Sequence, residues 1–220
     1  MHHKSTTNKG CFNGLPINTG NGRFFCFHII LQRLYDSMWW MTGKHCRVLA
    51  IRFDLHFPVD YKSKGENVEI QHFFKIMRDN ARNLSKRKGA KIDLHYVWVK
   101  EQKSSKHPHY HCIVFVNGSV VRDYRRFLGK VIKVWGRVLD RDAKNYVWPC
   151  DRNQKGMAVE NGVILERPPR KASVCTLIDS TISFNSAIDH LFYRASYLAK
   201  TNQKQDASPD SHRFGASQLR

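Results

Sequence analysis

The sequence predicts an α+β domain built around a central antiparallel sheet. Segments with alternating apolar side chains and segments with one apolar stripe follow one another in the order strand, helix, strand, strand, helix. With 220 residues, of which 41% are hydrophobic, the chain is long enough for one domain with a real core. These observations favour a single compact sheet with helices packed on it.

The individual elements follow from local patterns. Residues 47–57 alternate, with Leu49 and Ile51 on one side and Arg52, Asp54 and His56 on the other, which predicts a half-buried strand. A helix follows and ends at Gly89. Further strands are expected at 92–101 and 109–117 and a helix at 121–138. Residues 139–183 are expected to be irregular, with a hairpin turn at 161–162, and the last helix is expected at 184–201.

The flanking regions differ in composition from this central part. Residues 1–41 are expected to form an N-terminal extension, disordered over its polar first 22 residues and then an amphipathic helix at 24–41. The sheet domain is expected at 42–201, and residues 202–220 form a polar tail that we expect to be disordered. The chain has no apolar stretch of about 20 residues, and its six scattered cysteines are typical of free thiols. We therefore expect a cytoplasmic protein with no membrane partner.

The charge balance points to an anionic partner. The chain carries 37 Lys and Arg against 18 Asp and Glu, a formal charge of +19. Nucleic acid is the commonest partner of so basic a chain, ahead of membrane surfaces and ribosomal assemblies. On the helix at 121–138 four basic residues share one face, which is either a solvated surface or a track for DNA phosphates. The residues expected to contact DNA are Arg126, Lys130, Lys133 and Arg137, together with Arg52.

A metal site is predicted where two strands meet. His109 and His111 are two residues apart on one strand, so they point to the same face of the sheet. Glu101 ends the preceding strand and returns beside His109 if residues 102–108 close a hairpin. Two imidazoles and one carboxylate leave coordination positions for water and substrate oxygens, a set that suits Mg²⁺ or Mn²⁺, with zinc also compatible.

A second interpretation of the same histidines has to be weighed. His107, His109 and His111 with Cys112 resemble the motif of histidine-triad nucleotide hydrolases, in which the middle histidine is the nucleophile. Pro108 fits that motif poorly because it cannot donate a ladder hydrogen bond. A hydrolase of small nucleotides also has little use for a charge of +19.

The last predicted helix carries a candidate nucleophile. Tyr193, Tyr197 and Lys200 are spaced i, i+4 and i+7, so on a continuous helix they share a face opposite the apolar stripe. A tyrosine needs help to attack phosphate, because its pKa is about 10. A nearby lysine can lower that pKa or balance charge on the phosphorane, and a metal can polarise the P–O bond.

Together these motifs resemble the HUH endonucleases, and within them the rolling-circle replication initiators of filamentous phages and their prophage-encoded relatives. The segments that carry the resemblance are VLAIRFDLHFP at 48–58, VWVKEQ at 97–102, HPHYHCIVFVN at 107–117 and LFYRASYLAK at 191–200. The resemblance implies a ferredoxin-like, RRM-like antiparallel sheet with the tyrosine helix across the metal face. It implies His109, His111 and Glu101 as metal ligands, and Tyr197, Tyr193 and Lys200 as catalytic residues. Asp54 falls in the first strand motif as an accessory residue of undefined role.

The function implied by the resemblance is nicking of single-stranded or hairpin origin DNA. The tyrosine would keep the 5′ end as a phosphotyrosine and leave a 3′-OH for a host polymerase. The chain has no P-loop, so a host helicase would unwind the DNA. A transposase or relaxase would use the same chemistry on another target. A non-catalytic RRM-like nucleic-acid-binding domain would share the charge and topology, and it would expose aromatic residues on its sheet.

Overall fold

The computed structural model describes residues 5–102, 107–152, 156–159, 161–201 and 213–219. Four α-helices lie within these residues, namely α1 (His28–Lys44), α2 (Val68–Lys88), α3 (Tyr124–Leu139) and α4 (Val174–Ala195). Two short 3-10 helices are η1 (Lys144–Tyr146) and η2 (Ser196–Ala199). The strands are β1 (Thr6–Thr7), β2 (Cys11–Phe12), β3 (Leu15–Pro16), β4 (Cys26–Phe27), β5 (Arg47–Leu55), β6 (Leu94–Glu101), β7 (His109–Asn117), β8 (Val147–Pro149), β9 (Val163–Glu166) and β10 (Phe214–Ala216).

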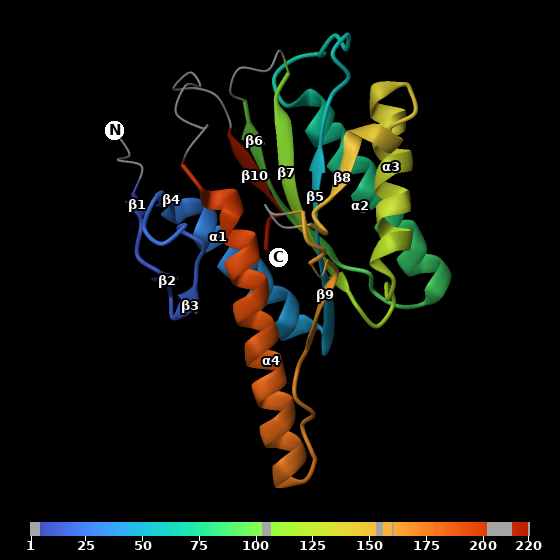
Figure 1. Ribbon diagram of the computed structural model, residues 1–220. Helices are drawn as coiled ribbons and strands as arrows, with labels where there is room; N and C mark the ends of the chain where they lie inside the picture. The colour runs from blue at the N-terminus through green and yellow to red at the C-terminus, as the bar shows by residue number, and fades with distance from the viewer. Residues whose placement is uncertain (1–4, 103–106, 153–155, 160, 202–212, 220) are drawn as a thin grey trace.

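A six-stranded antiparallel sheet forms the centre of the molecule. Its order is β10-β6-β7-β5-β8, and β9 pairs with β5 beside β8. Helices α2 and α3 cover one face of this sheet, and α1 and α4 lie on the other (Figure 1). The predicted α+β class with an antiparallel sheet is confirmed at this level.

Each face of the sheet has its own hydrophobic core. On the α2 and α3 side, Phe53 packs against Phe73, and Phe73 packs against Trp135. On the α1 and α4 side, the other parity of the same strands supplies Val48 and Ala50 to a second core. The expectation of a half-buried β5 was therefore wrong for its first half, where both faces are covered. After Arg47 at its start, polar residues of the strand begin at Arg52, toward one end of the sheet.

The segment expected to be irregular adds two strands to β5. β8 pairs with residues 53–55 and β9 with residues 47–50, so they extend the sheet instead of forming a hairpin with each other. Between them, the side-chain amide of Asn161 donates to the carbonyl of Arg52 and accepts from its backbone N–H. Asn161 thus takes the place of a strand residue, and the predicted hairpin turn at 161–162 was wrong.

The last helix begins ten residues earlier than expected and ends sooner. Its N-cap is Ser173, whose hydroxyl accepts from the backbone N–H of Thr176. The first turns are mostly exposed and carry no core-facing stripe, so apolar periodicity could not detect them. After Ala195 the chain tightens into η2, and Lys200 is already non-helical. Tyr193 and Tyr197 therefore lie on different elements.

Both terminal regions are more ordered than expected within the residues described. β1, β2 and β3 lie within residues 1–22, the part expected to be disordered; β2 pairs with β3, and β1 pairs with β4, which replaces the first residues of the expected helix. Helix α1 begins at His28 because Cys26 and Phe27 belong to β4. β10 pairs with β6, so the expected disordered tail was wrong for residues 214–216, while residues 1–4, 202–212 and 220 lie outside the described ranges.

Two further expectations concern cysteines and membranes. All six cysteines are free thiols in the structure. Among the helices in the described ranges, none has the length and hydropathy needed to cross a lipid bilayer.

Candidate metal centre

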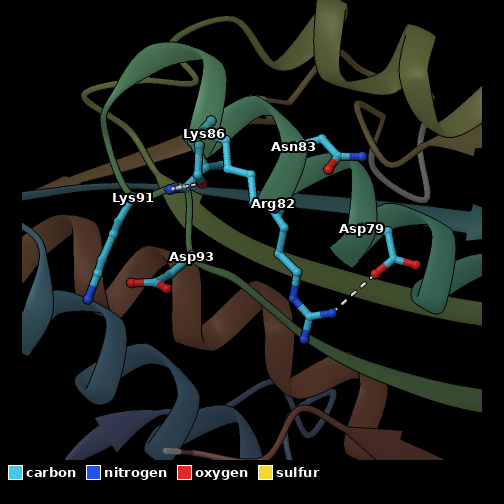
Figure 2. Close-up of a pocket in the computed structure, with 8 residues that line it drawn as sticks. Asp79, Arg82, Asn83, Lys86, Lys91 and Asp93 are labelled. Atoms are coloured by element: carbon cyan, nitrogen blue, oxygen red, sulfur yellow. Dashed lines mark hydrogen bonds and ion pairs between the residues drawn. The ribbon is translucent and has the colours of Figure 1, made fainter.

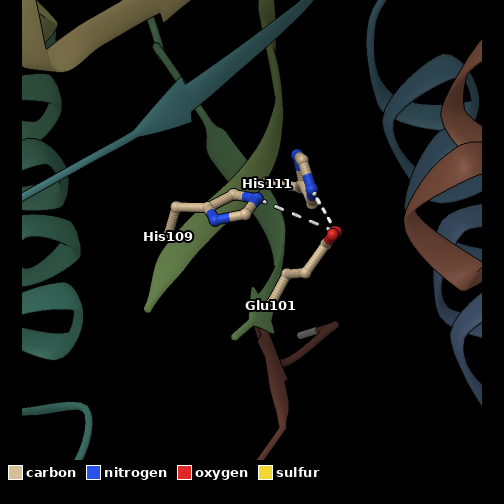
Figure 3. Close-up of side chains that lie close together, drawn as sticks. All are labelled: Glu101, His109 and His111. Carbon is tan, nitrogen blue, oxygen red and sulfur yellow. Dashed lines mark hydrogen bonds and ion pairs between the residues drawn. The ribbon is translucent and has the colours of Figure 1, made fainter. Parts of the chain in front are cut away.

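The β6–β7 hairpin brings the three predicted metal ligands together. Glu101 lies directly opposite His109 in the strand register, and His111 follows on the same face. Glu101 Oε2 lies 2.6 Å from His111 Nε2 and 3.8 Å from His109 Nε2 (Figure 3). One candidate ligand atom from each residue lies within 4.8 Å of the others. The predicted convergence is confirmed, and these three candidate metal ligands are called the triad below.

Asp54 orients His111 from the neighbouring strand. It is the register partner of His111 in β5, and its Oδ1 lies 2.8 Å from Nδ1 of the imidazole. When Nδ1 donates this hydrogen bond, Nε2 is directed at Glu101 and the triad. A carboxylate behind a histidine ligand fixes the tautomer and raises the basicity of the ligand nitrogen. The accessory residue of the sequence motif thus has a defined structural role.

The electrostatics of this pair favour a cation at the site. Burial alone would raise the pKa of Asp54, but the hydrogen bond and positive charge of His111 outweigh it and lower that pKa to about 2. Burial opposes protonation of His111, yet its hydrogen bonds to Asp54 and Glu101 raise its pKa. In this arrangement a proton joins His111 Nε2 to Glu101. A divalent cation would replace that proton, since both atoms are good metal ligands once deprotonated.

The donor set of the triad fits a divalent metal ion. Two imidazole nitrogens and one carboxylate oxygen provide a mixed nitrogen and oxygen set. Glu101 and His111 are buried, whereas His109 is partly exposed, so one side of the centre opens to solvent. Such a centre has room for water or a substrate oxygen.

Tyr197 is the tyrosine beside the triad. Its ring centroid lies 5.6 Å from that of His111, and the two rings are perpendicular. The guanidinium carbon of Arg52 lies 5.0 Å from the tyrosine ring, and Lys200 Nζ lies 5.6 Å from it. Burial and the nearby charge of Glu101 raise the pKa of Tyr197, while Arg52 acts to lower it. Arg52 therefore has the influence on this phenol that the sequence led us to expect from Lys200.

Tyr193 differs from Tyr197 in its environment. It lies in the last turn of α4 and is 44% exposed. Tyr193 lies in α4, Tyr197 in η2 and Lys200 after it, so the expected single helix through all three residues was wrong. The ammonium of Lys200 lies between two rings, 4.3 Å from the ring centroid of Phe24 and 5.6 Å from that of Tyr197.

The predicted basic stripe is not part of this centre. Arg126, Lys130, Lys133 and Arg137 are all exposed along α3. Helix α3 covers the opposite face of the sheet from the triad and α4 (Figure 1). Arg52 is the one member of the expected DNA-contacting set that contacts Tyr197.

Two aromatic residues beside the triad were not predicted. The His56 ring stacks on His109 at 5.1 Å with an interplanar angle of 10°, and the Trp148 ring lies 3.9 Å from His56. Burial and the neighbouring His109 lower the pKa of His56 to about 4, so this ring is neutral at pH 7. His56 could have been found from its parity with Arg52 and Asp54. Nothing in the local sequence marks Trp148, because its position depends on the pairing of β8 with β5.

A separate pocket lies at the other end of the sheet. It has a volume of about 630 Å³ and both acidic and basic walls (Figure 2). Its lining residues are Asp79, Arg82, Asn83, Ser85, Lys86, Lys91, Ile92 and Asp93. Asp93 precedes β6, whereas Glu101 ends it, which separates the pocket from the triad by roughly 25 Å of strand.

Comparison with known families places the chain in one of them. The family model of the YagK/YfjJ C-terminal domain matches residues 7–155, and the chain belongs to this family. The matched region contains Asp54 and the triad of candidate metal ligands and ends before the two tyrosines. No curated protein and no solved structure matches the chain.

Proposed function

We propose that this protein is a metal-dependent DNA-nicking enzyme of the HUH type that initiates rolling-circle replication. The observation that carries the proposal is the convergence of Glu101, His109 and His111, with the ring of Tyr197 5.6 Å from His111. These are the residues that the resemblance to HUH endonucleases assigns to metal binding and to nucleophilic attack. The charge of +19 further supports a nucleic-acid substrate.

The chemistry follows from the groups at the centre. A divalent cation held by the triad would neutralise charge on a phosphate and polarise its P–O bond. The phenolic oxygen of Tyr197 forms a bond to phosphorus, and the bond from phosphorus to the 3′ oxygen breaks. The 3′ oxygen leaves as a 3′-OH, so the phenolic proton is transferred in net to this leaving group. The phosphotyrosine keeps the energy of the broken ester, so the strand can be rejoined without ATP.

Arg52 and Asp54 support these groups from β5. The guanidinium of Arg52 lies beside the Tyr197 ring and favours the phenolate form that attacks. Asp54 holds His111 in the orientation that presents Nε2 to the cation. Both residues point to the face of β5 that carries the triad, since they are two positions apart on one strand.

The alternative functions fit the structure less well. An RRM-like binding domain needs an open sheet face for base stacking, but helices cover both faces here (Figure 1). A histidine-triad hydrolase needs three aligned histidines, but His107 hydrogen-bonds the carbonyl of Val59 and packs against Phe57, whereas His109 faces Glu101. A transposase or relaxase would share the proposed chemistry and differ in its DNA target. In cells the proposed initiator would act with a host helicase and polymerase.

The test is formation of a covalent adduct between the protein and single-stranded DNA. Labelled oligonucleotides are incubated with Mn²⁺ or Mg²⁺, and the products are separated by denaturing electrophoresis. We expect an adduct with the wild type, none with Tyr197→Phe, and none with Glu101→Gln or in EDTA. Tyr193→Phe is the matched control and should still form the adduct of the first cleavage, although repeated strand transfer should fail.

Two results would contradict the proposal. Absence of an adduct from the wild type with any single-stranded substrate and either metal would remove the nicking function. A full-strength adduct from Tyr197→Phe, together with none from Tyr193→Phe, would reverse the assignment of the two tyrosines.

A further inference from the structure

An exposed tryptophan lies on the sheet edge next to the triad. Trp148 is in β8, where its register partner is Asp54, so its side chain is on the face that carries the triad. It is 56% exposed, which is unusual for so large an apolar side chain beside a polar centre. Another exposed tryptophan, Trp39 of α1, is 37% exposed and packs against Tyr35 and Phe184 instead.

Trp148 begins a stack of rings that leads from solvent to the triad. Its ring lies 3.9 Å from that of His56, and His56 is parallel to His109. The indole Nε1–H donates to the carbonyl of Asn145 at 3.0 Å, which fixes the orientation of the ring. The indole is therefore held in place before any ligand binds, so a ligand would not have to supply the free energy to order it.

The strand that carries Trp148 is also tied to the tyrosine end of α4. Arg194 donates a 2.6 Å hydrogen bond to the carbonyl of Cys150, two residues beyond Trp148. Arg52 in turn donates to the carbonyl of Arg194. These hydrogen bonds connect the strand that carries Trp148 to the end of α4 and to Arg52 beside Tyr197. They therefore hold Trp148 and Tyr197 in a fixed position relative to each other.

We propose that Trp148 is a stacking platform for one nucleobase of single-stranded DNA next to the phosphate that is cleaved. The proposal rests on the proposed nicking function and names the form of its substrate. An indole stacks well on any base, and stacking of this kind tolerates many sequences. In a duplex the faces of the bases are already covered by their neighbours, so only an unpaired base can bind in this way.

Binding of two 12-nucleotide probes tests the platform. One is (dT)12, and the other is a 12-nucleotide chain of abasic sites with the same number of phosphates. Affinities are measured by fluorescence anisotropy in EDTA, so that no cleavage occurs. We expect the wild type to bind (dT)12 more tightly than the abasic chain. Trp148→Ala should weaken (dT)12 binding by roughly tenfold and leave the abasic chain unchanged, because one base stacked on an aromatic ring contributes on this order.

Further variants separate stacking from a structural role of the indole. Trp148→Phe keeps an aromatic ring and should retain most of the preference for (dT)12, whereas Trp148→Leu should lose it. Trp39→Ala is the matched control and should change neither affinity. A purely structural role, in which Trp148 only covers His56, predicts equal losses for both probes, and that result would overturn the proposal.

The outcome can be distinguished from failure of the nicking function. If the wild type forms the covalent adduct but binds both probes equally, the platform is wrong and the proposed function stands. If the wild type discriminates between the probes through Trp148 but forms no adduct, the platform stands as a binding site for single strands and the nicking function is wrong.

Discussion

Replacement of Asp54 by asparagine should weaken metal binding at the triad. The carboxylate holds His111 through a 2.8 Å hydrogen bond, and its pKa is lowered from 3.8 to about 2. At 1.36 kcal/mol per pKa unit this shift corresponds to about 2 kcal/mol of net stabilisation of the carboxylate, after the opposing effect of burial. A hydrogen bond to a charged group contributes about 1.5–3 kcal/mol, in agreement with that value.

The expected loss follows from this magnitude. Asparagine can still accept from Nδ1, but it lacks the negative charge that stabilises a cationic partner on the other side of the ring. We expect Mn²⁺ affinity to fall by roughly 10- to 100-fold, the usual effect of removing such a carboxylate from a histidine ligand. Isothermal titration calorimetry at pH 8 is suitable, because competition between the metal and the proton on His111 decreases as pH rises.

Asp93→Asn provides a matched control. Asp93 accepts a comparable hydrogen bond, 2.9 Å from Nε2 of His45, at the far end of the sheet. Its replacement should leave metal affinity unchanged. The reasoning would be refuted if Asp54→Asn bound Mn²⁺ within about twofold of the wild type while Glu101→Gln lost binding, because Asp54 would then have no part in the metal centre.

Three further predictions concern stability and DNA binding. Burial lowers the pKa of His95 from 6.5 to about 4, so the unfolded chain binds more protons than the folded chain between these pH values, and the free energy of unfolding falls as the pH decreases through them. Denaturant titrations at pH 7 and pH 5 should show a smaller fall in the free energy of unfolding for His95→Phe than for the wild type. Gly162→Ala should destabilise the fold by more than about 1 kcal/mol, since φ is +79° and an added Cβ would lie 2.6 Å from Cβ of Tyr124 and 2.7 Å from its ring. Gly129→Ala, with open space in α3, should stabilise the fold by about 0.5–1 kcal/mol, and comparison of the two midpoints of thermal unfolding checks both. Alanine at both Lys130 and Lys133 should reduce the slope of log K against log salt concentration for single-stranded DNA by about 0.7 per lost phosphate contact. Adduct formation on a short oligonucleotide should persist, because α3 lies across the sheet from the triad. An unchanged slope would show that these lysines form only a solvated surface.

The candidate metal centre could be predicted because its geometry is local. His109 and His111 share a face through the two-residue period of a strand, and a single hairpin brings Glu101 opposite His109. Asp54 could be noticed but not explained, since its contact with His111 depends on the register between strands 57 residues apart.

Other parts of the site depend on long-range pairing that one sequence does not reveal. Trp148 reaches the triad only because β8 pairs with β5, and the surrounding segment has no clear periodicity. A single helix through Tyr193 and Tyr197 was expected because a helical wheel assumes constant geometry, whereas the chain tightens into η2 after Ala195. The basic stripe of α3 was correctly placed on one helix face, but the sequence could not show which side of the sheet that helix covers.

The short strand β10 has a practical consequence for handling the protein. It covers the outer edge of β6, the strand that ends in Glu101, and hydrogen bonds from Lys100 to Arg213 and from Ser217 to Tyr96 extend the pairing at both ends. Gly215 lies so close to the Trp98 ring that an added Cβ would come within 2.6 Å of it. A chain shortened at residue 201, as its composition invites, would leave the apolar edge of β6 open to strands of other molecules. Aggregation of such a shortened protein would then reflect an unprotected sheet edge and would give no information about the chemistry of the metal centre.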